Sequence, residues 1–155
     1  MLRAREKKKQ FFTWLASFDA HRPFYEGISD EPYRAEDAII PPYMPDNEKV
    51  RKDFALYYDE ISRLDDYVGK VVAELEEQGV SDNTLILFMS DNGRAFPRDK
   101  TTLYEGGIKT PWIVKWPAKV KGGSINNNLI SSVDIAPTFM RVGSSIRVRR
   151  NGFHA

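Results

Sequence analysis

The sequence contains no cysteine, and this absence excludes three kinds of chemistry. Disulfide bonds, thiolate metal sites and a cysteine nucleophile all need a side chain that none of the 155 residues supplies. No run approaches the roughly 18 consecutive apolar residues of a membrane-spanning helix. The charged start of the chain, MLRAREKKK, also lacks the apolar segment of a signal peptide. We therefore expect no membrane span and no signal peptide in this sequence.

The composition is that of a globular chain, and the length predicts one domain or part of a larger one. Hydrophobic residues make up 41% and charged residues 29% of the sequence, and 12% aromatic residues suffice for a sizeable core. The charge is uneven, because residues 1–9 and 141–155 are basic whereas residues 10–140 are acidic. A basic end can contact nucleic acid. Short basic ends are more often solvated chain, so we expect poorly ordered ends and no nucleic-acid partner.

One long helix is the clearest secondary-structure prediction. After Asn47, a good N-cap, apolar residues recur every three or four positions across about residues 48–78. Gly79 is a natural stop for this helix. The apolar stripe, which includes Phe54 and Ile61, is expected to be buried.

Three short apolar runs predict strands, at residues 11–18 (FFTWLASF), 84–89 (TLILFM) and 112–116 (WIVKW). The first two flank the long helix, and the order strand, helix, strand is typical of a parallel sheet that is buried on both faces. The proline-rich residues 23–47 predict a long irregular loop. Asp134 predicts the N-cap of a last short helix. The expected fold class is therefore α/β, with a mixed, mostly parallel sheet flanked by helices.

Polar side chains follow two of the predicted strands. Asp19 and His21 come after the first strand, and Asp91 and Asn92 follow the second. Ligands of open parallel sheets bind beyond the carboxyl ends of the strands, so these residues mark a candidate site. Asp91 and Asn92 offer the hard oxygen ligands that suit Ca²⁺ or Mg²⁺. The same Asp-Asn-Gly sequence is also typical of an ordinary turn.

His21 and Lys100 are the candidate catalytic residues. A histidine at a strand end can act as a general acid or donate to an anionic leaving group. Lys100 lies in the loop after the second strand, where its ammonium group can hold an anionic substrate oxygen. For each residue the alternative is a solvated loop side chain, and these residue types alone leave both interpretations open.

Taken together, these segments resemble the sulfatase family of the alkaline phosphatase superfamily. The matching segments, in chain order, are FFTWLASFDAHRPF, YYDEISRLDDYVG, NTLILFMSDNG, FPRDKTTLYEGGIKTPWIVKWP and SSVDIAPTF. The order and spacing match over residues 10–140, which the resemblance identifies as a partial sulfatase catalytic domain. The FPRDK loop and the DAHR segment are most similar to the sulfamidase-like (heparan N-sulfatase-like) branch.

The resemblance implies a role for each candidate residue. Asp91 and Asn92 would help to bind a Ca²⁺ ion, Lys100 would contact the sulfate, and His21 would contact the sulfate or assist the leaving group. The metal and the cations would neutralise charge on the sulfuryl oxygens. The implied reaction is hydrolysis of a sulfate ester or an N-sulfate group on a sulfated small molecule or glycan. A periplasmic or extracellular location is a further inference from the family.

The sequence also departs from the family. The family's nucleophile is a formylglycine made from Cys or Ser in a Cys/Ser-x-Pro/Ala-x-Arg motif, and this chain has no such motif. The family's acidic metal pair near the first strand is missing as well. The chain therefore looks like the later part of a catalytic domain, with a truncated start and an altered end at residues 141–155. We expect it to bind Ca²⁺ weakly and to be inactive by itself.

Two alternatives stay open on these residues. One is a non-catalytic remnant that binds an anion or a partner. The other is a phosphoryl or phosphonyl hydrolase of the same superfamily.

Overall fold

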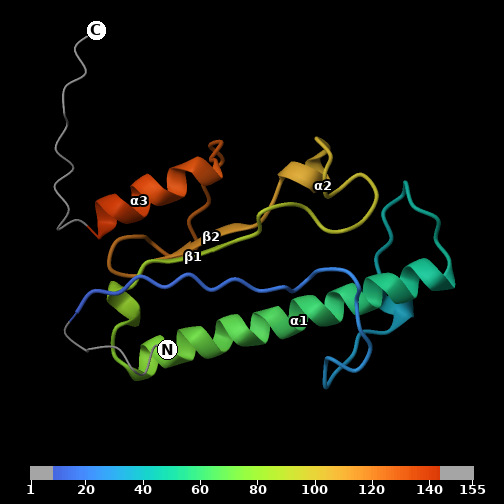
Figure 1. The fold of residues 1–155 in the computed structure, drawn as a ribbon, viewed down its shortest axis with the longest axis horizontal. Coiled ribbons are helices and arrows are strands. Elements are labelled where there is room, and N and C mark those ends of the chain that lie inside the picture. The colour runs from blue at the N-terminus through green and yellow to red at the C-terminus, as the bar shows by residue number, and fades with distance from the viewer. Residues whose placement is uncertain (1–8, 144–155) are drawn as a thin grey trace, which may run out of the picture.

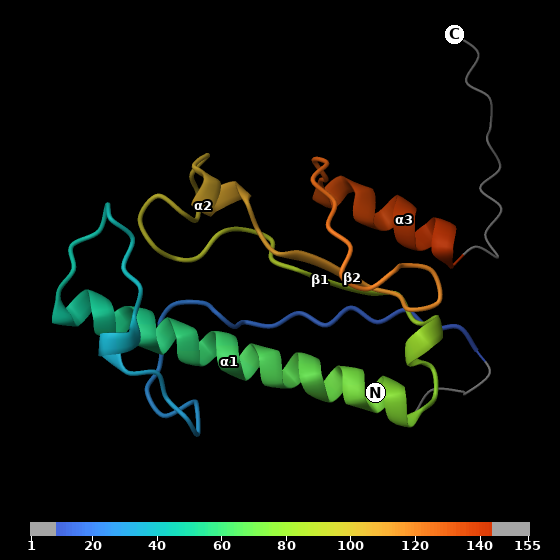
Figure 2. The same cartoon turned by 180° about the vertical axis from the view of Figure 1, so that it is seen from behind.

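The computed structural model describes residues 9–143 of the chain (Figure 1), so most of the two basic ends lies outside the described residues. The helices and strands, in chain order, are α1 (Glu48–Glu77), β1 (Ile86–Met89), α2 (Glu105–Ile108), β2 (Trp112–Lys115) and α3 (Ile135–Val142). In Figures 1 and 2 the extended N-terminal segment runs between α1 on one side and the two strands on the other. No helix within residues 9–143 is long and apolar enough to cross a membrane.

The bounds of the long helix α1 agree with the predicted ones, because local signals set both of its ends. The side-chain Oδ1 of Asn47 accepts a hydrogen bond from the backbone N–H of Val50 at 3.1 Å. At the other end the N–H of Val80 donates to the carbonyl oxygen of Leu75 at 3.1 Å, in the Schellman arrangement. Gly79 has a φ of 67°, in the left-handed region that favours glycine.

The buried face of α1 differs from the prediction at its middle. Ile61 is 41% exposed, so its predicted burial is wrong, whereas Asp59 and Glu60 are each 2% exposed. The Asp59 carboxylate accepts the backbone N–H of Tyr33 at 2.8 Å, and the Glu60 carboxylate accepts that of His21 at 3.0 Å. Here α1 faces irregular backbone, whose N–H groups need acceptors when they are buried. The helix therefore turns acids inward where an apolar stripe was expected.

The core lies on the N-terminal half of α1. Phe54, Phe96 and Ala38 form its buried cluster, and the rings of Phe54 and Phe96 stack with centroids 4.0 Å apart. Partly buried residues surround the cluster, namely Phe24, Ile40, Met44, Val50, Tyr57 and Tyr58. Three of these, Phe24, Ile40 and Met44, belong to residues 23–47, which form the predicted irregular loop and contain one short 3₁₀ turn, Ala35–Asp37. This loop folds back over α1 and contributes apolar side chains to the core.

The sheet corrects the prediction of mostly parallel strands. Within residues 9–143 it has two strands, and β1 pairs with β2 antiparallel, with Phe88 opposite Ile113. The connection that carries α2 reverses the chain between these strands. Residues 11–18, predicted as the first strand, are extended but carry no strand assignment. In Figure 1 they run in the same direction as β1 without joining its hydrogen-bond ladder.

Asp134 occupies the N-cap position of the C-terminal helix α3, as predicted, but its side chain makes no cap hydrogen bond to that helix. Asp134 ends a 3₁₀ turn, Ser132–Asp134, and its carboxylate accepts the backbone N–H of Ser131 at 3.1 Å in a capping box. Helix α3 follows directly. The ring of Phe139 in α3 contacts the ring of Phe12 edge-on, with centroids 5.6 Å apart, which joins α3 to the extended N-terminal segment.

Candidate functional site

Two segments carry the four residues predicted from the sequence. These residues are His21 on the first segment and Asp91, Asn92 and Lys100 on the loop after β1. The two segments are in direct contact, because the Nε of Arg22 donates to the carbonyl oxygen of Ala95 at 2.9 Å. The structure thus brings the backbone next to His21 against the loop that holds the other three residues.

Arg22 anchors the first segment, and the sequence reasoning missed it. Its guanidinium pairs with both carboxylate oxygens of Asp53 on α1. The same group lies over the rings of Phe24 and Phe96, with Cζ 4.5 Å and 5.0 Å from the centroids. The only sequence signal for the anchoring role of Arg22 is its position next to His21. These contacts restrict the backbone that carries His21.

The residue two positions before His21 is also fixed by α1. Asp19 accepts two hydrogen bonds from the Arg63 guanidinium, at 2.9 Å and 2.6 Å, and its side chain is 9% exposed. Glu60, which accepts the backbone N–H of His21, is buried. Burial raises the pKa of Glu60 and outweighs the opposing effect of that hydrogen bond. The segment around His21 is therefore attached to α1 through three side chains, those of Arg22, Arg63 and Glu60.

An ion pair organises the loop after β1. The Asp99 side chain is 1% exposed and accepts a hydrogen bond from the Nε of Arg94 at 2.5 Å. Burial lowers the pKa of Arg94, but its hydrogen bonds to Asp99 and Tyr43 and the charge of Asp99 raise it by more. The backbone N–H of Lys100 donates to the carbonyl oxygen of Arg94 at 3.0 Å. This pair therefore holds the backbone of Lys100 in place.

Three glycines let the loop close on itself. The N–H of Gly93 donates to the carbonyl oxygen of Gly107 at 3.2 Å. A Cβ added to Gly93 would lie 1.8 Å from the carbonyl oxygen of Gly106, and one added to Gly106 would lie 1.7 Å from Oδ1 of Asp99. No real side chain fits at such distances. Gly93 and Gly107 are thus required by close approach of backbone, whereas at Gly106 the space is taken by the Asp99 side chain.

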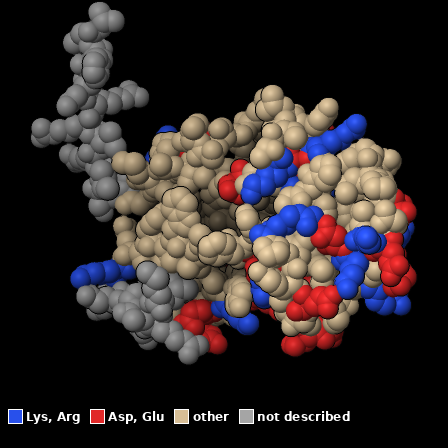
Figure 3. Space-filling model, turned by 45° about the vertical axis from the view of Figure 1, so that its right-hand side comes forward, with Lys and Arg blue, Asp and Glu red and all other residues tan. Residues whose placement is uncertain are grey.

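The four predicted site residues keep their side-chain functional groups available. Asp91, Asn92 and Lys100 make no side-chain hydrogen bond or ion pair with other residues of the described part of the chain. The Nδ1 of His21 lies 2.7 Å from the carbonyl oxygen of Arg22, and its Nε2 makes no such contact there. Several neighbouring charged residues, in contrast, are paired: Arg22 with Asp53, Asp19 with Arg63, and Arg94 with Asp99. Figure 3 shows that Lys, Arg, Asp and Glu crowd one part of the surface while another part is largely uncharged.

The predicted calcium site at Asp91 and Asn92 has an incomplete set of ligands in the described part of the chain. Among residues 9–143 no group of three or more His, Cys, Asp or Glu side chains is placed to hold a metal ion. The Asp91 carboxylate and the Asn92 amide remain two oxygen donors at the end of β1. Calcium takes about six to eight oxygens, so these two fit only as part of a ligand set.

The chain belongs to the sulfatase family, which confirms the resemblance drawn from the sequence. The family model described as Sulfatase matches residues 1–145. An ulvan-active sulfatase of Formosa agariphila is 39% identical over 103 residues, which are 66% of this chain and 17% of that protein. Human N-sulphoglucosamine sulphohydrolase is 36% identical over 109 residues, which are 70% of this chain and 22% of that enzyme. The chain therefore spans about a fifth of the length of these relatives.

Proposed function

We propose that this chain forms part of a sulfatase that hydrolyses sulfate esters or N-sulfate groups of a sulfated small molecule or glycan. Family membership supports the reaction class. The name of the human relative, N-sulphoglucosamine sulphohydrolase, supports the N-sulfate option. The observation that carries the proposal is the contrast between the candidate residues and the paired charged residues that support them. His21, Asp91, Asn92 and Lys100 keep free functional groups, on two segments that Arg22 joins.

Lys100 and His21 take the roles that their chemistry allows. The Lys100 ammonium has three N–H donors and a full positive charge, so it binds the sulfuryl oxygens and offsets charge that builds up during transfer. His21 donates a proton to the leaving oxygen or nitrogen as its bond to sulfur breaks. Both functions need a fixed backbone. The contacts of Arg22 and of the Arg94–Asp99 pair supply it.

Asp91 and Asn92 would hold a Ca²⁺ ion through a carboxylate and an amide oxygen, and the ion would polarise the sulfuryl oxygens. With two donors from this chain, we expect weak Ca²⁺ affinity. This sequence has no motif that matches the formylglycine of the family. A periplasmic or extracellular location also belongs to this proposal, and family membership is its support.

A titration with inorganic sulfate tests the role of Lys100. The ¹⁵N-labelled chain is titrated with sodium sulfate, and amide shifts are followed by NMR. We expect shifts around His21 and residues 93–107, and about tenfold weaker binding or more in Lys100→Ala, because one charge-assisted contact is lost. Lys119→Ala, a substitution of an exposed lysine after β2, is the matched control and should bind as the unaltered chain does.

Two results would contradict the proposal. Equal sulfate affinity in the Lys100 and Lys119 variants would remove Lys100 from the sulfate site. A response to inorganic phosphate without one to sulfate would favour the phosphoryl hydrolase alternative.

A further inference from the structure

Arg98 differs from its neighbours in how its charge is held. Five arginines of the described part pair with a carboxylate, namely Arg22, Arg34, Arg51, Arg63 and Arg94. Arg98 pairs with no carboxylate within residues 9–143. Its guanidinium lies instead against two aromatic rings, with Cζ 5.0 Å from the centroid of Tyr43 and 5.5 Å from that of Tyr104.

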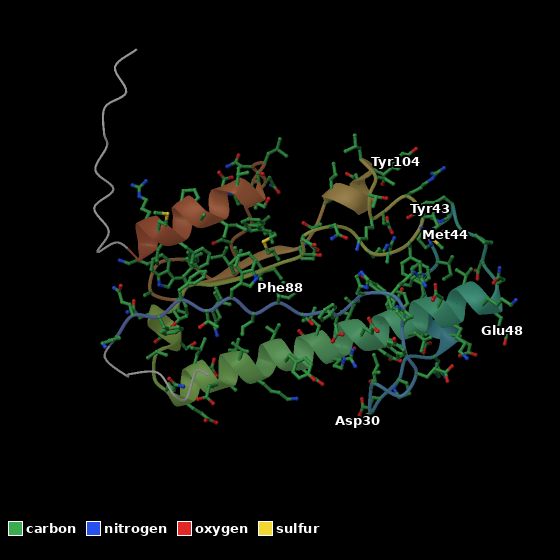
Figure 4. All side chains as sticks on the ribbon, in the orientation of Figure 1. Asp30, Tyr43, Met44, Glu48, Phe88 and Tyr104 are labelled. Carbon is green, nitrogen blue, oxygen red and sulfur yellow. The ribbon has the colours of Figure 1, made fainter. Side chains whose placement is uncertain are left out.

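The two tyrosines come from different parts of the chain. Tyr43 lies in the loop before α1, and Tyr104 immediately precedes α2; Figure 4 shows both at the same end of the molecule. Tyr43 is 39% exposed and Tyr104 is 60% exposed, and Arg98 itself is exposed. The rings therefore orient the guanidinium without covering it. Its N–H groups stay accessible to a ligand from solution.

The backbone at Arg98 is held in an unfavourable conformation. Arg98 has a φ of 65° and Thr101 a φ of 70°, both in the left-handed region that non-glycine residues rarely adopt. Backbone strain of this kind persists where the surrounding structure enforces it, and it clusters at ligand sites. Between these two residues in the sequence lies Asp99, which is buried and paired with Arg94.

Arg98 also lies next to the proposed sulfate contact. Two Cα–Cα steps separate it from Lys100, so the two Cα atoms are at most about 7.6 Å apart. The residue between them, Asp99, is buried, whereas Arg98 is exposed and Lys100 half-buried. Two cations on one short loop, both without a carboxylate partner among the described residues, suit two anionic groups on one ligand.

We propose that Arg98, Tyr43 and Tyr104 form a second anion subsite beside Lys100. The subsite binds an oxyanion, a carboxylate or a second sulfate, on the sugar ring next to the one whose sulfate Lys100 contacts. The guanidinium fork matches both oxyanions bidentately. This inference rests on the proposed function and narrows it, because the substrate class becomes a polyanionic glycan.

Saccharides that differ in their second anion test the subsite on the full chain by NMR titration. The probes are glucosamine N-sulfate, a disaccharide that adds a uronic acid to it, the carboxyl-reduced form of that disaccharide, and a disulfated disaccharide without a carboxylate. We expect about tenfold tighter binding of the uronate-containing or the disulfated disaccharide than of the monosaccharide, from one added charge-assisted contact. The Nε–H resonance of Arg98 should shift with that ligand only. The preferred ligand identifies which oxyanion the subsite takes.

Two variants and a control separate binding from folding. Arg98→Ala should remove the advantage of the disaccharide and leave the monosaccharide affinity unchanged. Arg98→Gly should do the same, and because glycine adopts a positive φ without strain, its fold is preserved. Arg34→Ala, which removes another exposed arginine, should change neither affinity.

The outcomes also distinguish this inference from the proposed function. A disaccharide advantage that survives in Arg98→Gly, or no advantage in the unaltered chain, overturns the subsite. Lys100→Ala should weaken every sulfated probe; if it does, the proposed function stands even when the subsite fails. Unchanged binding in Lys100→Ala overturns the proposed function, and no binding of any probe by the unaltered chain overturns both.

Discussion

A methyl group at Gly106 has no room in the loop that carries Lys100. A Cβ there would lie 1.7 Å from Oδ1 and 2.8 Å from Cγ of Asp99, well inside the 3.5–4.0 Å of an ordinary carbon contact. The Asp99 carboxylate must then leave its buried position and its ion pair with Arg94. Breaking a buried pair costs about 3–5 kcal/mol. The Arg94 side chain is 31% exposed, so we expect Gly106→Ala to lower the free energy of unfolding by about 3 kcal/mol, the low end of that range.

Urea denaturation followed by circular dichroism measures this effect, with Gly122→Ala as the matched control. A Cβ on Gly122 meets nothing within 4 Å, so the same substitution there should change the stability by less than about 0.5 kcal/mol. In thermal melts the Gly106 variant should unfold roughly 6–12 °C lower, at about 2–4 °C per kcal/mol for a chain of this size. Equal urea midpoints for the two variants would refute the reasoning, because Asp99 would then be free to move without cost.

Three further predictions concern the core, a buried acid and the activity. Phe54→Ala should lower the free energy of unfolding by about 3–5 kcal/mol, because Phe54 is 0% exposed and stacks on Phe96. Phe18→Ala, at a 90% exposed position, should lower it by less than about 0.5 kcal/mol. Equal urea midpoints for the two variants would contradict the assignment of Phe54 to the core. The pKa of Glu60 is raised above its ordinary 4.5, mainly by burial, so the folded state binds more protons than the unfolded state between the two pKa values. The stability contributed by Glu60 therefore falls as pH rises through that window. Glu60→Gln should gain stability relative to the unaltered chain as the pH rises above 4.5, as urea titrations at several pH values will show; a pH-independent difference would count against it. The isolated chain should show no turnover of a chromogenic sulfate ester, even with added Ca²⁺, because it carries no formylglycine motif; turnover that disappears in Lys100→Ala would prove this expectation wrong.

The sequence proposes the candidate site residue by residue, but it does not reveal the supports of those residues. His21, Asp91, Asn92 and Lys100 stand in short sequence motifs, and a motif is readable without the fold. Their convergence around one cleft stays a prediction, supported by the contact between Arg22 and the loop after β1. Arg22 and Asp19 find their partners at distant positions in the sequence, in the loop after β1 and on α1, which the sequence does not reveal.

The buried Arg94–Asp99 pair illustrates why such supports escape a sequence reading. Both residues are charged and lie in a loop, and such residues are usually exposed. Gly106 and Gly107 gave the one available signal, since adjacent glycines often mark a close backbone approach. Only the folded loop reveals that Asp99 occupies the space next to Gly106.

The sequence by itself determined those parts of the local structure that have strong local signals. Helix α1 begins after Asn47 and ends just before Gly79 as predicted, and β1 and β2 fall within the predicted apolar runs. Caps, apolar periodicity and glycine conformation act over a few residues, so neighbours along the chain suffice to set them.

The tertiary structure alone decided how these elements are paired and which of their faces are buried. The antiparallel pairing of β1 with β2, the extended but unpaired residues 11–18 and the exposed Ile61 all depend on contacts between distant parts of the chain. An apolar run predicts burial but not its partner, and a carboxylate such as that of Glu60 is buried only where the fold brings a backbone N–H to it. Long-range partners carry no local signal, and for this reason they had to be read from the structure.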